Sequence, residues 1–363
     1  MSTNAIYDYW LARTHGVPSS VKIRLDQFYG SAKEVYAASD SSLSRRRFMK
    51  PEHVSAISRS RQIWDLEGEY ALMRKDGARM VIWKDEEYPY MLCLLHDMPY
   101  AVYAKGRLPD VSRPSIAIVG ARSCSPYGKK QAEILSRALA EAGVNIISGM
   151  ALGIDGIAQR AAVSCGGYSL GILGSGIDLC YPERHHKLYC DLIENGGILS
   201  EYPLSDPPIR AHFPQRNRLI SILSHAVIVI EAREKSGSLI TADFALEQGR
   251  DVYAMPGPVD SLLSRGCHRL IEQGAKIVMS TEELLADLGK KQCKHLSLDK
   301  ETELPAMTES EEKVFPYLSD TPVKLSELEL LTGLEPAVLT NTLVSMQLKG
   351  IAKEFSLQHY VRV

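Results

Sequence analysis

The sequence predicts an open, doubly wound α/β sheet, and three observations lead to this fold class. Seven strand-like runs alternate with helical patterns between Ser115 and Gly289, which is typical of crossover units on a mostly parallel sheet. A glycine-rich loop follows the first run, as in folds that bind ligands at the carboxyl ends of their strands. A closed eight-stranded barrel is the competing fold, and the count of seven units favours the open sheet.

Each expected strand is a short apolar run that ends in a turn. In chain order the strands cover residues 115–121, 144–149, 168–174, 197–202, 226–232, 251–257 and 275–280. A helix is expected over 128–142 after the first strand, and another begins near Ser238 after the fifth. Both strand-to-helix loops therefore lie at the carboxyl edge of the sheet.

The segments on either side of this sheet differ from it. Residues 1–75 read as short helices separated by turns and form a small helical N-terminal domain. This domain holds twelve Lys and Arg against eight Asp and Glu, densest at 44–50, which indicates either a solvated basic face or an auxiliary phosphate-contacting surface. From Arg79 onward, short strands joined by turns lead into the sheet domain, which we place at 76–290.

A polar stretch without apolar periodicity, residues 291–307, is expected to be a linker. Residues 308–363 follow with three helices and two strands, the order of a winged-helix domain. This domain has five basic and eight acidic side chains, and its third helix carries only Lys349. A recognition helix so poor in cations should bind DNA weakly, so protein contact or self-association is the better interpretation.

Composition limits the classes of protein that the chain can belong to. A length of 363 residues suggests two or three domains, and a formal net charge of −2 means that a nucleic-acid partner needs a local basic surface. No apolar run approaches the roughly 18 residues of a membrane span, and residues 1–10 lack a signal-peptide pattern, so we expect a cytoplasmic protein without membrane contact. Seven cysteines form no CxxC pair, which favours reduced thiols over disulfides or zinc.

The loop after the first strand, IVGARSCSPYG, is the first candidate for phosphate contact. Gly120 lets the backbone approach a ligand, the following helix start offers free N–H groups, and Arg122 and Ser125 add side-chain donors. The GxGxxG fingerprint is absent and no acidic residue ends the second strand. A nicotinamide is therefore not expected, and no other cofactor is indicated.

The loop after the fifth strand, EAREKSGS, is the second candidate. Ser236, Gly237 and Ser238 bring small residues and hydroxyls to a helix start, and Lys235 brings a mobile charge, which together make a phosphate cradle. A plain helix cap would need only one serine.

Arg216 raises a question of pairing. It lies on the apolar stripe of a helix that begins near Gln215, whereas Arg218 points the other way. A buried guanidinium needs a partner, and residues 210–235 contain five Lys and Arg against two Glu, so a phosphate is one answer. The internal alternatives are Glu201, Asp178 and Glu231.

Catalytic patterns are sparse. The GxSxG, HExxH and GxxxxGK[ST] motifs are all missing, so no enzyme is indicated. His185 and His186 are expected as a surface pair, because no third metal ligand lies at the usual spacing. Asp155 is placed either to orient Arg122 or Arg216, or to cap its own helix.

Several blocks along the chain resemble one protein family. They read IVGARSCSPYG, SGMALGIDGIAQRAA, LGSGIDLCYP, LSEYP, FPQRNRLISILS, EAREKSGSLITADFALEQGRDVYAMPG and SRGCHRLIEQGA. Their order and spacing are similar to those of the DprA/Smf family of bacteria, the DNA-processing proteins A. The lead-in at 88–106, the helical N-terminal domain, of SAM or helix-hairpin-helix type, and the C-terminal tail also resemble that family.

The resemblance implies an extended Rossmann-like domain that binds single-stranded DNA and not a dinucleotide. It also implies a homodimer that delivers the strand to the RecA recombinase during natural transformation, with no catalytic activity. The family's DNA-contacting positions fall at Arg122, at Arg216, Asn217 and Arg218, and at Lys235, Ser236, Gly237 and Ser238. The chain departs from the usual family residues at Leu152, Gln159 and His268.

The expected mechanism is therefore binding. The two helix starts and their cations hold successive phosphates, and Phe213, Tyr127 and Tyr181 are the nearest candidates for base stacking. An enzyme or sensor acting on a mononucleotide, resembling the phosphoribohydrolases of similar sheet architecture, is the alternative. That class has a PGGxGT loop with a nearby Glu, whereas here no Glu follows KSGS until Glu247. A scaffold whose DNA contact is incidental is a third reading.

Overall fold

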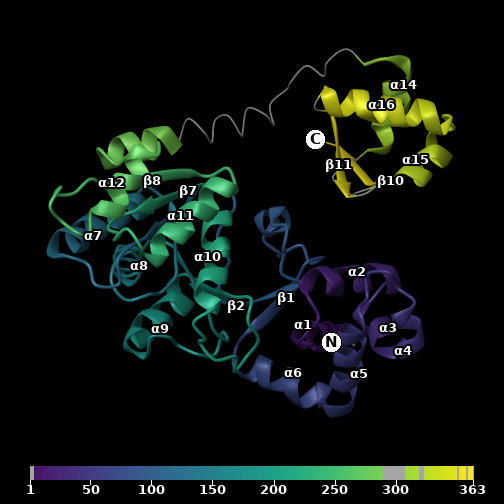
Figure 1. Ribbon diagram of the computed structural model, residues 1–363, viewed down its shortest axis with the longest axis horizontal. Helices are drawn as coiled ribbons and strands as arrows, with labels where there is room; N and C mark the ends of the chain where they lie inside the picture. The colour runs from purple at the N-terminus through teal and green to yellow at the C-terminus, as the bar shows by residue number, and fades with distance from the viewer. Residues whose placement is uncertain (1–3, 289–306, 319–322, 350, 357–358, 363) are drawn as a thin grey trace. The chain divides into compact units, whose positions relative to one another are not determined.

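The computed structural model describes residues 4–288, 307–318, 323–349, 351–356 and 359–362. The chain divides into two compact units, Met1–Asp287 and Leu288–Val363. The first contains the N-terminal helices and the large sheet, and the second contains the C-terminal helices and a small sheet (Figure 1).

Six helices precede the sheet, as the sequence predicts for residues 1–75. They are α1 (Asn4–Arg13), α2 (Ser19–Tyr29), α3 (Ala32–Ala37), α4 (Asp40–Ser44), α5 (Pro51–Ile63) and α6 (Leu66–Lys75). Their core is built around the fully buried Trp10, Leu25 and Ile57, and it continues into Ile82 and Tyr100 beside the first two strands. Because this core is shared with the sheet, the boundary at residue 75 remains a prediction.

The sheet has nine strands in the order β1-β2-β6-β5-β4-β3-β7-β8-β9. They are β1 (Arg79–Ile82), β2 (Ala101–Gly106), β3 (Ser115–Val119), β4 (Asn145–Ser148), β5 (Ser169–Leu173), β6 (Gly197–Ser200), β7 (Ala226–Val229), β8 (Asp251–Ala254) and β9 (Lys276–Ile277). The seven strands from β3 onward are the seven predicted ones, and all pair in parallel. The sheet is open, so the competing barrel is excluded.

Helices follow the parallel strands in the crossover pattern that the sequence predicts. They are α7 (Pro126–Glu141), α8 (Ile154–Ser164), α9 (His186–Asn195), α10 (His212–Ile222), α11 (Gly237–Glu247) and α12 (Arg265–Glu272). In one group α7 and α9 both pack against α8, and in another α10 packs against α11 (Figure 1). This is an α/β Rossmann-like architecture with two antiparallel strands, β1 and β2, added at one edge.

The order of the strands reverses at β3. From β3 the chain builds β4, β5 and β6 on one side, and it returns to add β7, β8 and β9 on the other. The first turns after β3 and β7 therefore diverge at neighbouring strand ends. In open α/β sheets this is the place where a crevice forms and ligands bind.

The second unit follows the predicted order of three helices and a final strand pair. It contains α14 (Glu309–Val314), β10 (Val323–Lys324), α15 (Leu325–Thr332), α16 (Pro336–Leu348), β11 (Ala352–Ser356) and β12 (His359–Arg362), with a sheet order of β10-β12-β11. The winged-helix assignment itself remains a prediction. Except for Met307, the predicted linker 291–307 lies outside the described residues.

Within the described part of the chain, no helix combines the length and the apolarity needed to cross a membrane. The six cysteines in that part are free thiols, in agreement with the expectation from their spacing.

Candidate nucleic-acid interface

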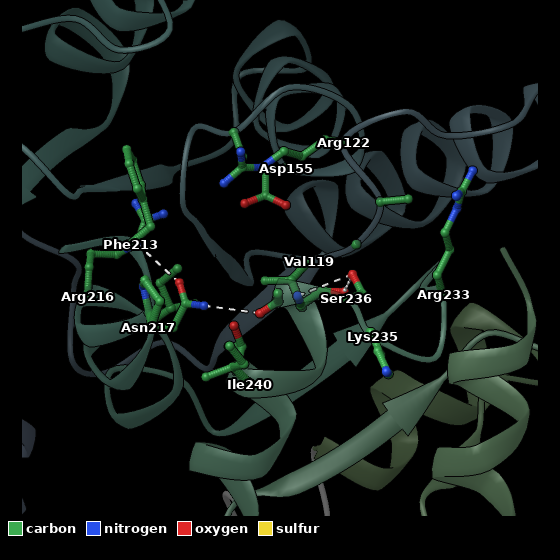
Figure 2. Close-up of a pocket in the computed structure, with 18 of the residues that line it drawn as sticks. Val119, Arg122, Asp155, Phe213, Arg216, Asn217, Arg233, Lys235, Ser236 and Ile240 are labelled. Carbon is green, nitrogen blue, oxygen red and sulfur yellow. Dashed lines mark hydrogen bonds between the residues drawn. The ribbon is translucent and has the colours of Figure 1, made fainter. Parts of the chain in front are cut away.

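A cavity of about 850 Å³ opens at the point where the strand order reverses. We call it the switch-point cavity. Its walls are the loops that follow β3 and β7, the turn before α8, and the first half of α10 (Figure 2). Eight of the ten predicted contact residues line it: Gly120, Arg122, Arg216, Asn217, Lys235, Ser236, Gly237 and Ser238.

The loop after β3 supplies Gly120 and Arg122. A side chain at Gly120 would come within 2.8 Å of Ile154 Cγ1 and 3.0 Å of the Glu231 carbonyl oxygen, so glycine is required for the close packing of this turn. Arg122 is exposed, and its guanidinium carbon lies 5.8 Å from the centre of the Phe213 ring. The cation is therefore available on the cavity surface and is positioned beside an aromatic face.

Ser125 does not line the cavity, which differs from the sequence expectation. Its backbone N–H and its hydroxyl donate to the two carboxylate oxygens of Glu231, at 2.9 and 2.5 Å. Its Oγ also accepts from the N–H of Gly128 and caps α7. An internal carboxylate thus occupies the helix start that the sequence offered to a phosphate.

The loop after β7 is arranged much as the sequence predicts. Ser236 caps α11, and its hydroxyl lies 2.8 Å from that of Ser238. The side-chain amide of Asn217 donates to the Gly237 carbonyl at 3.3 Å, which ties this loop to α10. Lys235 is exposed at the same edge.

Arg216 lines the cavity but is only 4% exposed. Its Nη1 donates to the carbonyl of Gly149 at 2.9 Å and also to the carbonyl of Ile172. Burial lowers the pKa of Arg216 to about 10, against the opposing effect of Asp155. Backbone carbonyls at the ends of β4 and β5 are therefore the main hydrogen-bond partners of this buried guanidinium.

The three internal carboxylates considered for Arg216 bind other groups. Glu231 accepts from Ser125, Asp178 accepts from the backbone N–H of Ser205 at 2.8 Å, and Glu201 accepts from Arg218.

Arg218 is a correction to the predicted contact set. It is 9% exposed, does not line the cavity, and forms ion pairs with Glu201 and with Asp97, the latter at 3.1 Å from Nε. Two residues along a helix rotate a side chain by about 200°, so Arg216 and Arg218 leave α10 on nearly opposite sides. One meets the strand ends and the other meets carboxylates behind the helix.

Asp155 supports the turns around the cavity. Its Oδ2 accepts from the Gly149 N–H at 3.1 Å, and it also accepts from Ser148 and from the Gly120 backbone. Burial raises its pKa, while Arg216 and these hydrogen bonds oppose that effect. The carboxylate therefore orders backbone next to Arg216, and Gly153 occupies the cap position of α8.

Two cavity cations were missed in the residue-by-residue prediction. Arg210 and Arg233 both line the cavity and are exposed. The feature of the sequence that indicates them is the excess of Lys and Arg over Asp and Glu in residues 210–235. With them, the cavity lining holds five cations and one carboxylate, Asp155. Among the described residues, no ion pair involves Arg122, Arg210, Arg233 or Lys235.

Two of the three aromatic residues expected to stack on bases line the cavity, and the third does not. Phe213 and Tyr181 line the cavity with their ring centres 5.4 Å apart. Tyr127 lies outside it and donates its hydroxyl to the Pro256 carbonyl at 2.6 Å. Two rings on one wall give a base a place to stack.

The expected surface pair of histidines is wrong for one member. His185 is buried, and its Nδ1 lies 2.9 Å from the Met150 carbonyl oxygen, whereas His186 is exposed. In the part of the chain that the structure describes, no group of three His, Cys, Asp or Glu residues is placed to hold a metal ion.

Comparison with known proteins identifies the family. The model of the DNA recombination-mediator protein A family matches residues 79–289. The chain is 42% identical over 224 residues to protein Smf of Escherichia coli, covering 61% of this chain and 60% of the relative. It is 42% identical over 203 residues to DNA processing protein DprA of Streptococcus pneumoniae, covering 56% of this chain and 72% of that one.

Two solved structures agree. The DprA structure from Streptococcus pneumoniae has a TM-score of 0.66 and 33% identity, and it matches over 77% of this chain and 97% of its own. A structure on the single-stranded DNA binding mode of DNA processing protein A from Helicobacter pylori has a TM-score of 0.53 and 32% identity, over 59% and 96%. Because the family model covers more than half of the chain, this protein belongs to the DNA recombination-mediator protein A family, the DprA/Smf family.

Proposed function

We propose that this protein binds single-stranded DNA in the switch-point cavity and protects the incoming strand during transformation and recombination. One observation carries the proposal: four exposed cations surround one crevice at the carboxyl edge of the sheet, and none of them has an ion-pair partner among the described residues. They are Arg122, Arg210, Arg233 and Lys235. The chain as a whole has a formal net charge of −2, so this local excess is the feature that selects a polyanion.

The binding mode follows from the kinds of groups in the cavity. The four cations hold phosphates by charge, and the N–H groups at the start of α11 with the hydroxyls of Ser236 and Ser238 add directed donors. Phe213 and Tyr181 offer stacking to any base. Such contacts do not read base identity, so binding is tolerant of sequence and sensitive to salt.

A single strand suits this cavity better than a duplex. Its unpaired bases can turn toward the aromatic wall while its phosphates face the cations, whereas the bases of a duplex remain stacked on one another. The relative from Helicobacter pylori, studied for its single-stranded DNA binding mode, supports a single strand as the ligand.

The wider role is also part of the proposal. We propose a cytoplasmic homodimer that passes the bound strand to the RecA recombinase, with no cofactor and no catalytic step. The family's description as a recombination mediator supports this role. Asp155, the one carboxylate in the cavity lining, accepts hydrogen bonds from the backbone of Gly149 and Gly120, which gives it a structural role in these turns.

Fluorescence anisotropy with labelled single- and double-stranded oligonucleotides, measured on the full chain across a salt series, tests the binding proposal. We expect tighter binding of the single strand and a steep loss of affinity with salt. Equal affinity for both forms, or affinity that does not change with salt, would reject the proposal. Release of a free base from nucleoside monophosphates would reject the non-enzymatic assignment and restore the phosphoribohydrolase-like alternative.

A further inference from the structure

A second cavity of about 270 Å³ lies within the first unit, away from the strand-order reversal. We call it the α1–α2 cavity. Its walls are the end of α1 and the loop to α2 on one side, and β2, the loop after β6 and the start of α10 on the other. The residues that bear on its chemistry are Arg13, His15, Lys22, Tyr103, Asp206 and His212.

Lys22 is the main anomaly of this cavity. It is 7% exposed, and its ammonium donates to the Ala12 carbonyl at 2.5 Å. An ammonium has three donors, and no salt bridge satisfies the others in the described part of the chain. Burial lowers the pKa of Lys22 to about 7, with no carboxylate opposing the effect.

Lys105 is a buried lysine with a structural role only, and its hydrogen-bond partners can be compared with those of Lys22. It is 8% exposed, and its ammonium lies 2.6 Å from Asp76 and 3.1 Å from the Tyr189 hydroxyl. A lysine at the same depth thus receives a carboxylate and a hydroxyl. Lys22 receives a single carbonyl, which leaves a buried cation without a counter-charge.

Three polar atoms of residues that line this cavity lack hydrogen-bond partners in the described structure, and one of them is Arg13 Nε. The hydroxyl of Tyr103, a residue only 1% exposed, and the Nδ1 of His212 are both buried without a hydrogen bond in the described structure. A buried unsatisfied polar atom costs about 1 to 3 kcal/mol. The unpartnered atoms of these lining residues and the single hydrogen bond of the Lys22 ammonium together point to a polar ligand in this cavity.

The charges on the cavity wall set the orientation of that ligand. Arg13 is paired with Glu69 through Nη1, and Glu201 is paired with Arg218. Asp206 also lines the cavity, and its carboxylate contributes to the raised pKa of Tyr103. An anionic group therefore belongs at Lys22, and an uncharged hydroxyl belongs near Tyr103 and Asp206.

We infer that the α1–α2 cavity binds a small hydroxylated anion, with its phosphate or carboxylate on Lys22 and its hydroxyl toward Tyr103. The size agrees, because pockets for larger organic ligands begin near 300 Å³, so a ligand smaller than a nucleotide is required. His212 lies at the start of α10, next to Phe213 of the switch-point cavity, so the ligand contacts the same helix that holds Arg216.

The test uses the full chain labelled with ¹³C at the lysine ε-carbons. Glycerol 3-phosphate, inorganic phosphate and lactate are the probes, and the Lys22 signal is assigned by its loss in Lys22→Met. We expect the phosphate compounds or lactate to shift the Lys22 signal while leaving that of Lys105 in place. The probe that binds more tightly identifies the anionic group as phosphate or carboxylate.

Affinity measurements separate this cavity from the other one. By calorimetry, Lys22→Met should weaken binding of the best probe roughly 10- to 100-fold, as loss of a charged hydrogen bond does, and Tyr103→Phe about fivefold. Lys130→Ala, at an exposed lysine that lines neither cavity, should bind that probe as the wild type does. If Lys22→Met does not fold, the wild-type titration with Tyr103→Phe still decides, and Lys22→Arg supplies the assignment.

Three results would overturn the inference. The first is a Lys22 signal that none of the probes moves. The second is probe affinity unchanged in both Lys22→Met and Tyr103→Phe. The third is a Lys22 signal that moves with a thymidine oligonucleotide but not with small anions, because the cavity would then belong to the DNA path. The first two results do not depend on whether the switch-point cavity binds DNA.

Discussion

Replacing Lys235 with alanine removes one of the four exposed cations of the switch-point cavity and should change the salt dependence of single-strand binding by a calculable amount. Arg216 is left out of the count because it is buried and already bonded to two carbonyls. Each neutralised phosphate of a single strand contributes about −0.7 to the slope of log affinity against log salt, so four contacts give about −2.8. Between roughly 50 and 200 mM salt the wild type then loses about 50-fold in affinity, and Lys235→Ala about 18-fold.

The assay is fluorescence anisotropy with a labelled oligothymidine at several salt concentrations. Lys130→Ala is the matched control, because Lys130 is an exposed lysine on α7 that does not line the cavity. Its slope should equal that of the wild type. A slope for Lys235→Ala that equals the wild-type slope, or an equal change in Lys130→Ala, would refute the assignment of the phosphate contacts to this cavity.

Three further predictions test other parts of the structure. Ser125→Ala should leave single-strand affinity within about twofold of wild type and lower the free energy of unfolding by about 1 kcal/mol. The Ser125 hydroxyl caps α7 and bonds to Glu231, and the residue does not line the cavity. A marked loss of DNA affinity would contradict this. The free energy of unfolding of the wild type, relative to that of Lys22→Met, should rise between pH 7 and pH 10. Burial lowers the folded-state pKa of Lys22 from 10.5 to about 7, so the unfolded chain binds the extra proton in that interval. A difference in unfolding free energy between the two proteins that is the same at both pH values would contradict this. In the second unit, burial raises the pKa of Glu311, but hydrogen bonds from Lys349, Thr308 and Ser345 outweigh it and lower the pKa to about 2, so stabilisation from this group is present above pH 4.5 and is lost as the pH falls toward 2. The hydrogen-exchange protection factors of α14 and α16 should therefore fall over that interval in the wild type and fall less in Glu311→Gln.

The parallel sheet and the location of the cavity could be predicted because both depend on local pattern. Each strand from β3 onward is a short apolar run followed by a turn, and that alternation fixes a parallel order. The loops after β3 and β7 were identified from glycine and serine at helix starts. Their meeting at one cavity follows from the general rule for strand-order reversal, which needs no knowledge of side-chain contacts.

The contacts of individual polar side chains could not be predicted, because their partners are far away in the sequence. Ser125 binds Glu231, which is 106 residues away, and Arg218 binds Asp97 across a similar separation. No periodicity connects such positions. The expected DNA contact of Arg218 rested on its place beside Asn217 and Arg216. The two arginines that flank Asn217 look alike in sequence, but their side chains leave the helix on opposite sides.

The same difficulty shows why a helix start is weak evidence for an anion site. Both α7 and α11 begin with a serine cap after a glycine- or serine-containing loop, and nothing in the local sequence distinguishes the two helix starts. Glu231, at the end of β7, fills the start of α7, whereas Ser236 and Ser238 at the start of α11 bond to one another and face the cavity. An internal carboxylate at one helix start removes a competing anion site and leaves the phosphate contacts to the other start and to the exposed cations. The charge of the cavity is thus set as much by where the protein places its own acids as by where it places its arginines and lysines.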